Sequence, residues 1–398
     1  MRICMILSTP IPPQEGIGFY VWNLSRQLKQ LGHDVLVVTR GGSNEKEEEE
    51  IDGILVLRPA FFPIYPFHVS IHGRFVDQLL HKLGDNIDLV HLHTPLVKAP
   101  NVTKPVVVTV HTPMKSDTKA VTIDSVIGLL VKLQAPFSFK IEQSLFDRAN
   151  SLTAVAHSVA DEMAAYNIDP AEVTVLGNGV DTSLFYPTSM DQDKRLITPN
   201  PYALTVARLA PRKGLADLIE CANIVVKEHP TFRFLIAGTG PIEEKLRSQI
   251  KRHKLEKNVV LLGHIRNRTR LIELYRNATI FVHPAHYEGL PTVLLEAMAC
   301  GCPVVTTAVS GALDVIHHRQ NGLLVTPKIP SEIAAGIIEL LENSVQAKKL
   351  GQAAVETIEE HYAWQIITQG YLKEYEKFIN VQKMLVGVST LNNIQALV

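Results

Sequence analysis

The chain has 398 residues, which is too long for one compact core and indicates two or three domains. Hydrophobic residues make up 46% of the sequence and charged residues 20%, which is typical of a globular protein rather than a disordered or fibrous one. The 39 basic and 40 acidic residues leave a net charge of −1, whereas a nucleic-acid partner held by its phosphates would require a large basic excess. The four cysteines are too few and too scattered for a disulfide framework or a zinc site, so we expect a reducing, cytoplasmic setting.

The beginning of the chain does not resemble a targeting segment. Its apolar run ends at Ser8 and Pro10, which is too short for a signal peptide, and no stretch reaches the ~18 apolar residues of a membrane span. We therefore expect a protein that contacts at most the cytoplasmic surface of a membrane.

Residues 1–185 alternate between apolar runs of strand length and amphipathic segments of helix length. The predicted strands are Ile3–Leu7, Val35–Thr39, Ile54–Leu57, Leu89–Leu92, Val106–Val110, Leu152–Val155 and Val173–Leu176. The predicted helices are Tyr20–Leu31, Phe75–Leu83 and a long segment from about Ile123 to Arg148. The acidic run Glu47–Glu50 is most simply a solvated loop. Because these strands are apolar on both faces, we expect a parallel sheet covered by helices on both sides.

Residues 186–201 interrupt this alternation and have the composition of a linker, since the segment is polar, proline-containing and without periodicity. Asp191 and Asp193 within it resemble a metal-binding carboxylate pair, but a solvated turn is the simpler interpretation.

The alternation resumes after residue 201, so the same α/β architecture occurs twice, as two doubly wound parallel-sheet domains of the Rossmann-like kind. The predicted strands are Tyr202–Val206, Arg233–Ala237, Val259–Leu262, Ile280–His283, Pro303–Thr306 and Gly322–Val325. The predicted helices are Leu215–Glu228, Ile242–His253, Arg268–Arg276, about Pro291–Cys300, and Ser331–Glu342.

The segments that follow the strands of the second half carry the residues suited to an anionic ligand, because open parallel sheets bind ligands beyond the carboxyl ends of their strands. After the first strand comes ARLAPRKG, in which Arg208 offers a bidentate fork and Lys213 a compact charge, a pair suited to a diphosphate. Two solvated surface cations are an equally acceptable interpretation. After the second strand comes GTGP (238–241), whose glycines permit a tight turn but make a poor dinucleotide fingerprint.

The richest passage is HYEGLPTVLLEAMACGCPVV, which contains Glu288 in a loop and Glu296 inside the following helix. The amides near Gly289–Val293 would have no partners at a helix start and would be available to an anion. Glu288 and Glu296 could both be surface residues, but the helix is largely apolar and a buried carboxylate needs a partner. We therefore favour a role for both carboxylates in binding hydroxyl groups.

Several histidines also stand out, among them His91, His93, His283 and His286. His91 and His93 share one face of a strand, but the sequence offers no third ligand. We interpret them as packing or acceptor-binding residues and expect no metal site.

Together these motifs resemble the retaining glycosyltransferases of family 4 (glycosyl transferases group 1), which have the GT-B fold. The resemblance is carried by E-x7-E and ARLAPRKG, with DLVHLHTP (88–95), TVHT (109–112), LGNGVD (176–181) and GxGP (238–241) in the same order. It spans about residues 1–380 and implies two Rossmann-like domains that face each other across a cleft. The implied parts are an acceptor domain (1–185), a linker (186–201), a nucleotide-sugar domain (202–361), a helix crossing back to the first domain (about 362–380) and a tail (381–398).

The resemblance also implies roles for individual residues. Arg208 and Lys213 would neutralise the leaving diphosphate, Glu288 would bind hydroxyls of the transferred sugar, and His111 would lie near the sugar and the acceptor. These four form the expected catalytic set. The expected donor-binding set is Gly16, Gly18, Gly240, Gly289, Leu290, Pro291, Thr292, Val293 and Glu296, the last of them at the nucleotide ribose. No metal or other cofactor is expected.

The N-terminal loop departs from the family pattern, which has two adjacent glycines. Here these positions are Glu15 and Gly16, with Gly18 following, so Gly16 keeps the position expected to present its amide to the donor diphosphate.

The resemblance predicts transfer of a hexosyl unit from a nucleotide-diphosphate sugar to a lipid or glycan precursor. A nucleotide-sugar epimerase or hydrolase of the same fold, or a non-catalytic binding subunit, remains as an alternative. Lys115–Lys140 could form a basic, apolar surface that touches anionic lipid, although a core helix with a solvated basic edge is the simpler interpretation.

Overall fold

The computed structural model describes residues 1–13, 16–41, 45–120, 126–187 and 201–395. The chain forms two compact units. The first comprises Met1–Gly177 together with Ile367–Val398, and the second comprises Asn178–Ile366.

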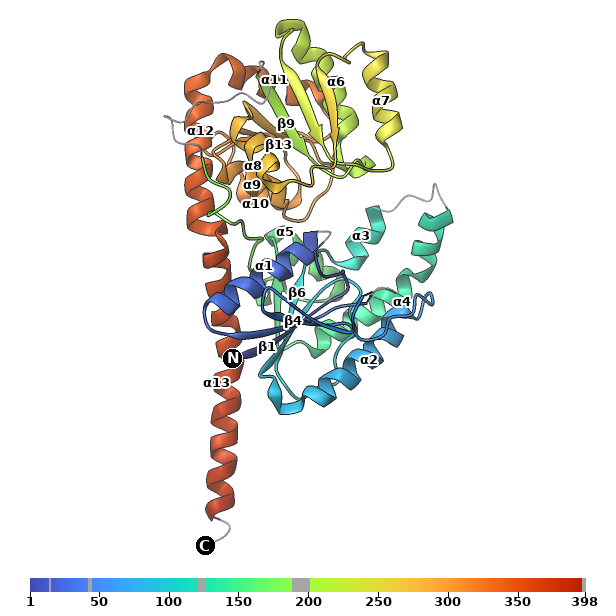
Figure 1. Ribbon diagram of the computed structural model, residues 1–398, viewed down its shortest axis with the longest axis vertical. Helices are drawn as coiled ribbons and strands as arrows, with labels where there is room; N and C mark the ends of the chain where they lie inside the picture. The colour runs from blue at the N-terminus through green and yellow to red at the C-terminus, as the bar shows by residue number, and fades with distance from the viewer. Residues whose placement is uncertain (14–15, 42–44, 121–125, 188–200, 396–398) are drawn as a thin grey trace. The chain divides into compact units, whose positions relative to one another are not determined.

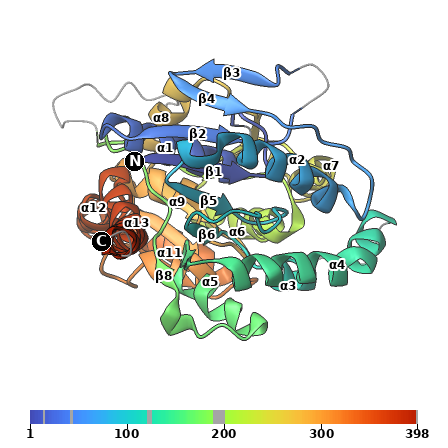
Figure 2. The ribbon, with the colours of Figure 1, turned by 90° about the horizontal axis from the view of Figure 1, so that it is seen from below.

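The first unit is built on an eight-stranded sheet in the order β3-β4-β2-β1-β5-β6-β7-β8, whose strands pair in parallel except for β3 with β4 (Figure 2). Its central strands are buried on both faces, which is why the sequence shows continuous apolar runs there. The strands are β1 (Arg2–Leu7), β2 (Asp34–Val38), β3 (Glu48–Ile51), β4 (Ile54–Leu57), β5 (Leu89–His93), β6 (Val106–Val110), β7 (Ser151–Ala154) and β8 (Thr174–Val175).

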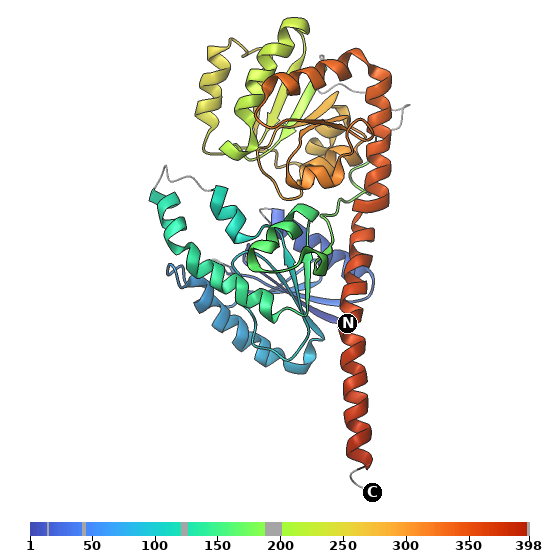
Figure 3. The ribbon, with the colours of Figure 1, turned by 180° about the vertical axis from the view of Figure 1, so that it is seen from behind.

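Helices cover both faces of this sheet, with α2 and α4 on one side and α13 on the other (Figures 1 and 3). The helices are α1 (Gly16–Gln30), α2 (His68–Leu83), α3 (Met114–Ala120), α4 (Val126–Arg148), α5 (His157–Glu162) and α13 (Trp364–Gln395), with short turns η1 (Gly84–Asn86), η2 (Met163–Tyr166) and η3 (Pro170–Glu172). Gly32 has a φ of 84° just after α1, the left-handed conformation in which a glycine commonly ends a helix.

The second unit contains a six-stranded parallel sheet in the order β11-β10-β9-β12-β13-β14. Its strands are β9 (Tyr202–Val206), β10 (Arg233–Ala237), β11 (Val259–Gly263), β12 (Ile280–His283), β13 (Val304–Thr307) and β14 (Leu323–Val325). Its helices are α6 (Leu215–Glu228), α7 (Glu243–Arg252), α8 (Arg268–Asn277), α9 (Thr292–Ala299), α10 (Ser310–Val315), α11 (Pro330–Glu342) and α12 (Ser344–Thr357), with short turns η4 (Pro211–Lys213) and η5 (Ile358–Tyr362).

Two sequence-based expectations about local structure are wrong. The acidic run predicted as a loop forms β3, because Glu48–Ile51 pair antiparallel with Ile54–Leu57 across a turn at Asp52 and Gly53, where both residues have positive φ. The predicted tail from residue 381 is also not separate, since α13 continues without a break to Gln395.

The boundaries between the units also differ from the predicted ones. The predicted first domain ends at residue 185, whereas the second unit begins at Asn178. The reason is that the chain after Asn178 pairs with the end of the same unit. The Val180 amide donates to the Tyr362 carbonyl at 2.8 Å, and the Trp364 amide donates to the Val180 carbonyl at 3.2 Å.

Within the described part of the chain, none of the helices combines the length and apolar character that crossing a bilayer requires.

Glycine substitutions test the loop packing of the second unit. Gly214 and Gly263 have φ values of 65° and 71°, so alanine at either position costs about 1–2 kcal/mol of backbone strain. A Cβ on Gly214 would also lie 1.8 Å from the Pro284 carbonyl oxygen, whereas one on Gly263 would meet nothing within 4 Å. We expect Gly214→Ala to lower the thermal unfolding midpoint much more than Gly263→Ala. Equal losses would contradict this packing.

Candidate active site

Three adjacent strands of the second unit, β10, β9 and β12, end at the same edge of their sheet, and the loops after them contact one another. The Leu209 amide donates to the Thr239 carbonyl at 2.9 Å, which ties the loop after β9 to the loop after β10. The His286 amide donates to the Arg212 carbonyl at 2.8 Å, which ties the loop after β9 to the loop after β12. The sequence therefore brings its three candidate loops together, as parallel-strand topology requires.

Lys213 and Glu288 form an ion pair between two of these loops, with the Nζ of Lys213 donating to Oε2 of Glu288. Their side chains are only 15% and 17% exposed. Burial alone would raise the pKa of Glu288, but the charge and the hydrogen bond of Lys213 outweigh it, and the net pKa lies below the ordinary value. Glu288 is thus an ionised carboxylate at neutral pH, held beside a cation.

His283, the last residue of β12, lies behind this pair. Its Nε2 is 3.9 Å from Oε2 of Glu288, and its Nδ1 lies 3.3 Å from Oγ1 of Thr306. Burial lowers the pKa of His283 to about 4, so the ring is neutral. The ring supports Glu288 without adding a charge.

Helix α9 begins directly after this loop, with Pro291 at its N-cap and no side chain capping it. Its first amides, from Thr292 and Val293, have no acceptor inside the helix and therefore favour an anion. The preceding turn is fixed because Nδ2 of Asn178 donates to the Leu290 carbonyl and the Gly311 amide donates to the Gly289 carbonyl at 3.0 Å.

Glu296, on the second turn of α9, has the partner that a buried carboxylate needs. The hydroxyl of Tyr275 on α8 donates to its Oε2 at 2.8 Å. Burial raises the pKa of Glu296 to about 7 despite this hydrogen bond and the nearby charge of Arg268. Glu288 and Glu296, eight residues apart, therefore differ in charge near neutral pH.

Two other predicted residues of this unit have different surroundings from Lys213. Arg208 is exposed, and its side chain has no ion pair within the described residues. Gly240 is explained by packing, because a Cβ there would lie 2.3 Å from the Leu209 carbonyl oxygen. Gly240 thus allows the loops after β9 and β10 to approach closely, which accounts for a glycine here without a role in ligand binding.

The predicted residues of the first unit lie on α1 and at the end of β6. Gly16 and Gly18 occupy the first turn of α1, where Gly16 is exposed and Gly18 packs against Pro13 and Thr9. Their amides lack intrahelical acceptors, as expected for an anion site. His111 directly follows β6 and is 8% exposed.

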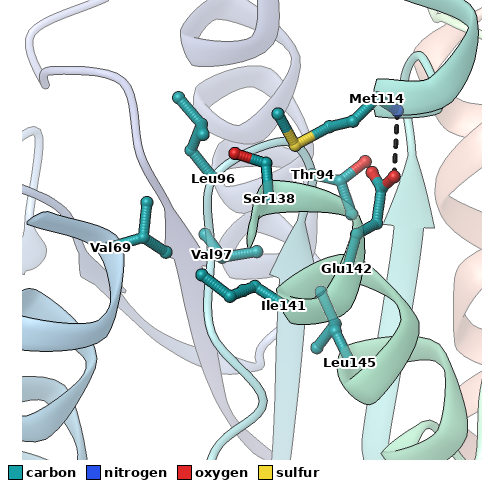
Figure 4. Close-up of a pocket in the computed structure, with 9 residues that line it drawn as sticks. All are labelled: Val69, Thr94, Leu96, Val97, Met114, Ser138, Ile141, Glu142 and Leu145. Carbon is teal, nitrogen blue, oxygen red and sulfur yellow. Dashed lines mark hydrogen bonds between the residues drawn. The ribbon is translucent and has the colours of Figure 1, made fainter. Parts of the chain in front are cut away.

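A small pocket in the first unit contains a buried acid that the sequence analysis did not single out (Figure 4). Glu142 on α4 is 3% exposed, accepts from the Met114 amide at 2.9 Å and accepts from the Tyr166 hydroxyl. Its Oε1 and the Oγ1 of Thr94 have no hydrogen-bond partner in the described structure. Burial raises the pKa of Glu142 to about 7. The lining residues are Val69, Thr94, Leu96, Val97, Met114, Ser138, Ile141, Glu142 and Leu145.

In the described part of the chain, no three histidine, cysteine or acidic side chains are arranged to hold a metal ion. Asp191 and Asp193, considered above as a carboxylate pair, lie outside the described residues.

Comparison with known proteins identifies both halves of the chain. Residues 15–184 match the family described as Glycosyltransferase Family 4, and residues 188–357 match Glycosyl transferases group 1. The chain belongs to glycosyltransferase family 4. Its two sheets are those of the GT-B fold, as the sequence motifs predict.

Relatives with different activities share this architecture. Glycogen synthase from Mycobacterium tuberculosis is 28% identical over 401 residues, covering 94% of each chain. The structure of sucrose-phosphate synthase from Thermosynechococcus elongatus matches with a TM-score of 0.81 at 19% identity, covering 96% of this chain and 100% of that one. Anabaena Alr3699/HepE in complex with UDP-glucose matches with a TM-score of 0.73 at 19% identity, covering 94% and 99%.

Several contacts of the candidate site could not be predicted from the sequence. Tyr275 gave no signal, because nothing in a sequence reveals which helix lies beside Glu296. Asn178 stands in the LGNGVD motif, which indicated its importance but not its contact with Leu290. His286 was noted only as one of several histidines, and its Nε2 lies 2.6 Å from Oδ2 of Asp217 at the start of α6.

The buried acid of the pocket predicts how stability changes with pH. Because the folded-state pKa of Glu142 is about 7 against an ordinary 4.5, the folded protein holds this proton more tightly than the unfolded chain. Its contribution is fully present below pH 4.5 and is lost as the pH rises through 7, a loss of up to ~3 kcal/mol. We expect Glu142→Gln to unfold at a higher temperature than the wild type at pH 8, with no such gain at pH 4.

Asp147→Asn provides the control for this experiment, since Asp147 is an exposed carboxylate on the same helix. A Glu142→Gln variant whose unfolding midpoint follows that of the wild type at every pH would contradict the assignment.

Proposed function

We propose that this family-4 glycosyltransferase moves a hexosyl unit from a nucleotide-diphosphate sugar to an acceptor, with retention of anomeric configuration and without a metal ion. The observation that carries the proposal is the half-buried Lys213–Glu288 pair beside the uncapped start of α9. Cation, carboxylate and amides converge where the strands of the sheet end, and these are the groups that a phosphorylated sugar requires.

The charges of the site support this chemistry. Breaking a glycosyl–phosphate bond builds positive charge on the sugar ring and negative charge on the diphosphate. Lys213, the more exposed Arg208 and the first amides of α9 are fixed positive groups for the diphosphate. Glu288, ionised at neutral pH, would accept hydrogen bonds from sugar hydroxyls, and Glu296 would accept them from the ribose.

The same residues favour a catalytic protein over a non-catalytic subunit. A non-catalytic subunit would have no need to keep two charged side chains with low exposure, which cost free energy to bury. An epimerase or hydrolase would consume the donor without an acceptor. Donor consumption measured with and without a glycan or lipid acceptor separates these activities, and the neighbour in complex with UDP-glucose makes that sugar nucleotide the first donor to assay.

Alanine at either member of the pair tests the site. We expect Lys213→Ala and Glu288→Ala each to lower kcat by about 10²–10³, because one fixed electrostatic contact to the reacting groups is lost. Unfolding curves check that each variant folds. The double variant leaves no unpaired charge and should fold at least as well while remaining inactive.

Arg247→Ala is the matched control, since Arg247 and Glu243 form an exposed ion pair on α7. Near-normal turnover in a folded Lys213→Ala or Glu288→Ala variant would overturn the site assignment.

We further propose that the acceptor is lipid-borne, because the first unit exposes an apolar surface. It combines the loop before α2 with α4, and the rings of Phe67 and Phe137 lie 5.9 Å apart where the two meet. This apolar surface consists of Phe62, Ile64, Tyr65, Phe67, Leu133 and Phe137, which are 47–68% exposed. Single exposed apolar residues are common, but six on these two neighbouring segments are suited to a lipid surface.

The basic residues predicted to flank this surface differ among themselves. Lys140 is exposed on α4 and available to anionic lipid. Lys115 instead lies over the Tyr166 ring, with Nζ 4.0 Å from its centroid. Residues 126–131 belong to the apolar run from which this surface was predicted. The structure describes their backbone but not their side chains.

Liposome flotation tests the membrane contact. We expect the wild type to float with vesicles containing anionic lipid and the double variant Leu133→Ser, Phe137→Ser to float much less, because each substitution removes apolar area from the bilayer. Leu31→Ser, at a 48% exposed leucine outside the apolar surface, is the control. Failure of the wild type to float on any vesicle would remove the membrane proposal and leave a glycan acceptor.

A further inference from the structure

The core of the first unit contains a group of polar side chains that packing alone does not explain. His91 and His93 on β5 are 0% exposed, and His111 after β6 is 8% exposed. We call these three residues the histidine cluster. Their rings are close, with centroids 4.1 Å apart for His91 and His93 and 5.5 Å apart for His93 and His111. Such a group needs hydrogen bonds to be stable in a core.

His91 is fully bonded to structural partners. Its Nδ1 lies 2.8 Å from the hydroxyl of Tyr375, and its Nε2 lies 2.7 Å from Oγ1 of Thr109. Thr109 continues the network to Thr153 at 2.7 Å and to the hydroxyl of Tyr371 at 2.9 Å. This part of the cluster joins α13 to the sheet and leaves no ring nitrogen for a ligand.

His93 makes a different contact. Its Nδ1 lies 3.3 Å from Nε2 of His111, and its own Nε2 has no partner among the described residues. The ring of Tyr20 on α1 holds His111 from another side, edge to face at 4.8 Å. The Nδ1 of His111 has no hydrogen bond within the described structure, so it is the nitrogen left for a substrate.

All three rings are neutral. Burial lowers the pKa of His91 and His111 to about 3 and that of His93 well below its ordinary value. Each ring therefore carries one proton, and in the bond between His93 and His111 one ring donates and the other accepts.

The position of that proton follows from the unpaired nitrogen. If His111 donated, His93 would carry its proton on Nε2, which would be a buried N–H without an acceptor. If His93 donates, the unpaired Nε2 carries a lone pair instead, and buried unpaired acceptors are tolerated more often than buried unpaired N–H groups. The second arrangement puts the His111 proton on Nδ1.

We propose that His93 is a positioning residue that holds His111 in the Nδ1-protonated form, so that His111 acts toward the substrate as a neutral hydrogen-bond donor and not as a base. The proposal rests on the proposed function for the role of His111. The tautomer of His111 is a property of the protein alone and does not depend on the proposed function. Neither nitrogen of His111 then has a lone pair free to accept a proton from an acceptor hydroxyl.

Nitrogen-15 NMR of the histidine side chains in the full-length protein tests the tautomer directly. We expect the His111 resonances, assigned by their loss in His111→Gln, to show a protonated Nδ1 and a bare Nε2 across pH 5 to 8. In His93→Phe, which keeps a ring but cannot donate, this single form should be lost. A wild-type His111 that carries its proton on Nε2 would overturn the proposal.

Kinetics of the same variants test the consequence. We expect His93→Phe to lower kcat roughly tenfold, the value of one hydrogen bond, with the donor KM nearly unchanged. His93→Asn places an amide N–H near the position of Nδ1 and should recover most of the rate. Equal loss in the phenylalanine and asparagine variants would show that His93 only fills space.

Tyr375→Phe is the matched control, because it removes a hydrogen bond to His91 in the same core without touching His111. It should reduce stability and leave both kcat and the His111 resonances as in the wild type. The tautomer is measured without substrate, so a His111 proton on Nε2 would overturn only the proposal for His93. Lys213 and Glu288 variants that keep their activity would instead overturn the site assignment of the proposed function.

Discussion

The ion pair between Lys213 and Glu288 is the interaction on which the candidate active site depends. Removing two charges from water is costly, and a buried pair is stable only when its geometry is held by its surroundings. Here the close packing of the loop backbones holds the pair in place. Gly214 allows the loop after β9 to reach Pro284, and Gly240 allows the next loop to reach Leu209. In the proposed function, Lys213 and Glu288 neutralise each other until the donor binds, and then Lys213 would turn to a phosphate and Glu288 to a sugar hydroxyl.

The surroundings of each glutamate determine its pKa, so residues of the same type in the sequence carry different charges in the structure. Glu288 has a cation beside it, and the pKa of Glu288 is lowered. Glu296 and Glu142 are each buried against a tyrosine hydroxyl, and burial raises the pKa of both to about 7. The ion pair with Lys213 outweighs the effect of burial at Glu288, whereas the hydrogen bonds and nearby charges at Glu296 and Glu142 do not, so the three glutamates have two different protonation states near neutral pH.

The sequence was sufficient for the fold class and for the convergence of the three candidate loops in the second unit, because both depend on short-range patterns. Apolar runs gave the strands, and the residues after those strands had to meet at one edge of a parallel sheet. The partners Tyr275 and Asn178 could not be predicted, since they come from elements distant in sequence whose packing is decided by tertiary structure. The edge strand β3 was missed for another reason: its four residues Glu48–Ile51 are mostly glutamate, and cross-strand pairing with β4 overrides their low strand propensity. The hydrogen-bond network around His91 could not be predicted either, because Tyr371 and Tyr375 come from the far end of the chain.

The first unit is discontinuous in sequence, and this affects how the protein is made. Tyr371 and Tyr375, which close the polar network around Thr109 and His91, are synthesised only after the whole second unit. During translation the early sheet therefore has polar groups in its core region without their partners, while the later unit already has all of its strands. The first unit therefore begins to be synthesised first but can complete its folding only after the second unit has been synthesised.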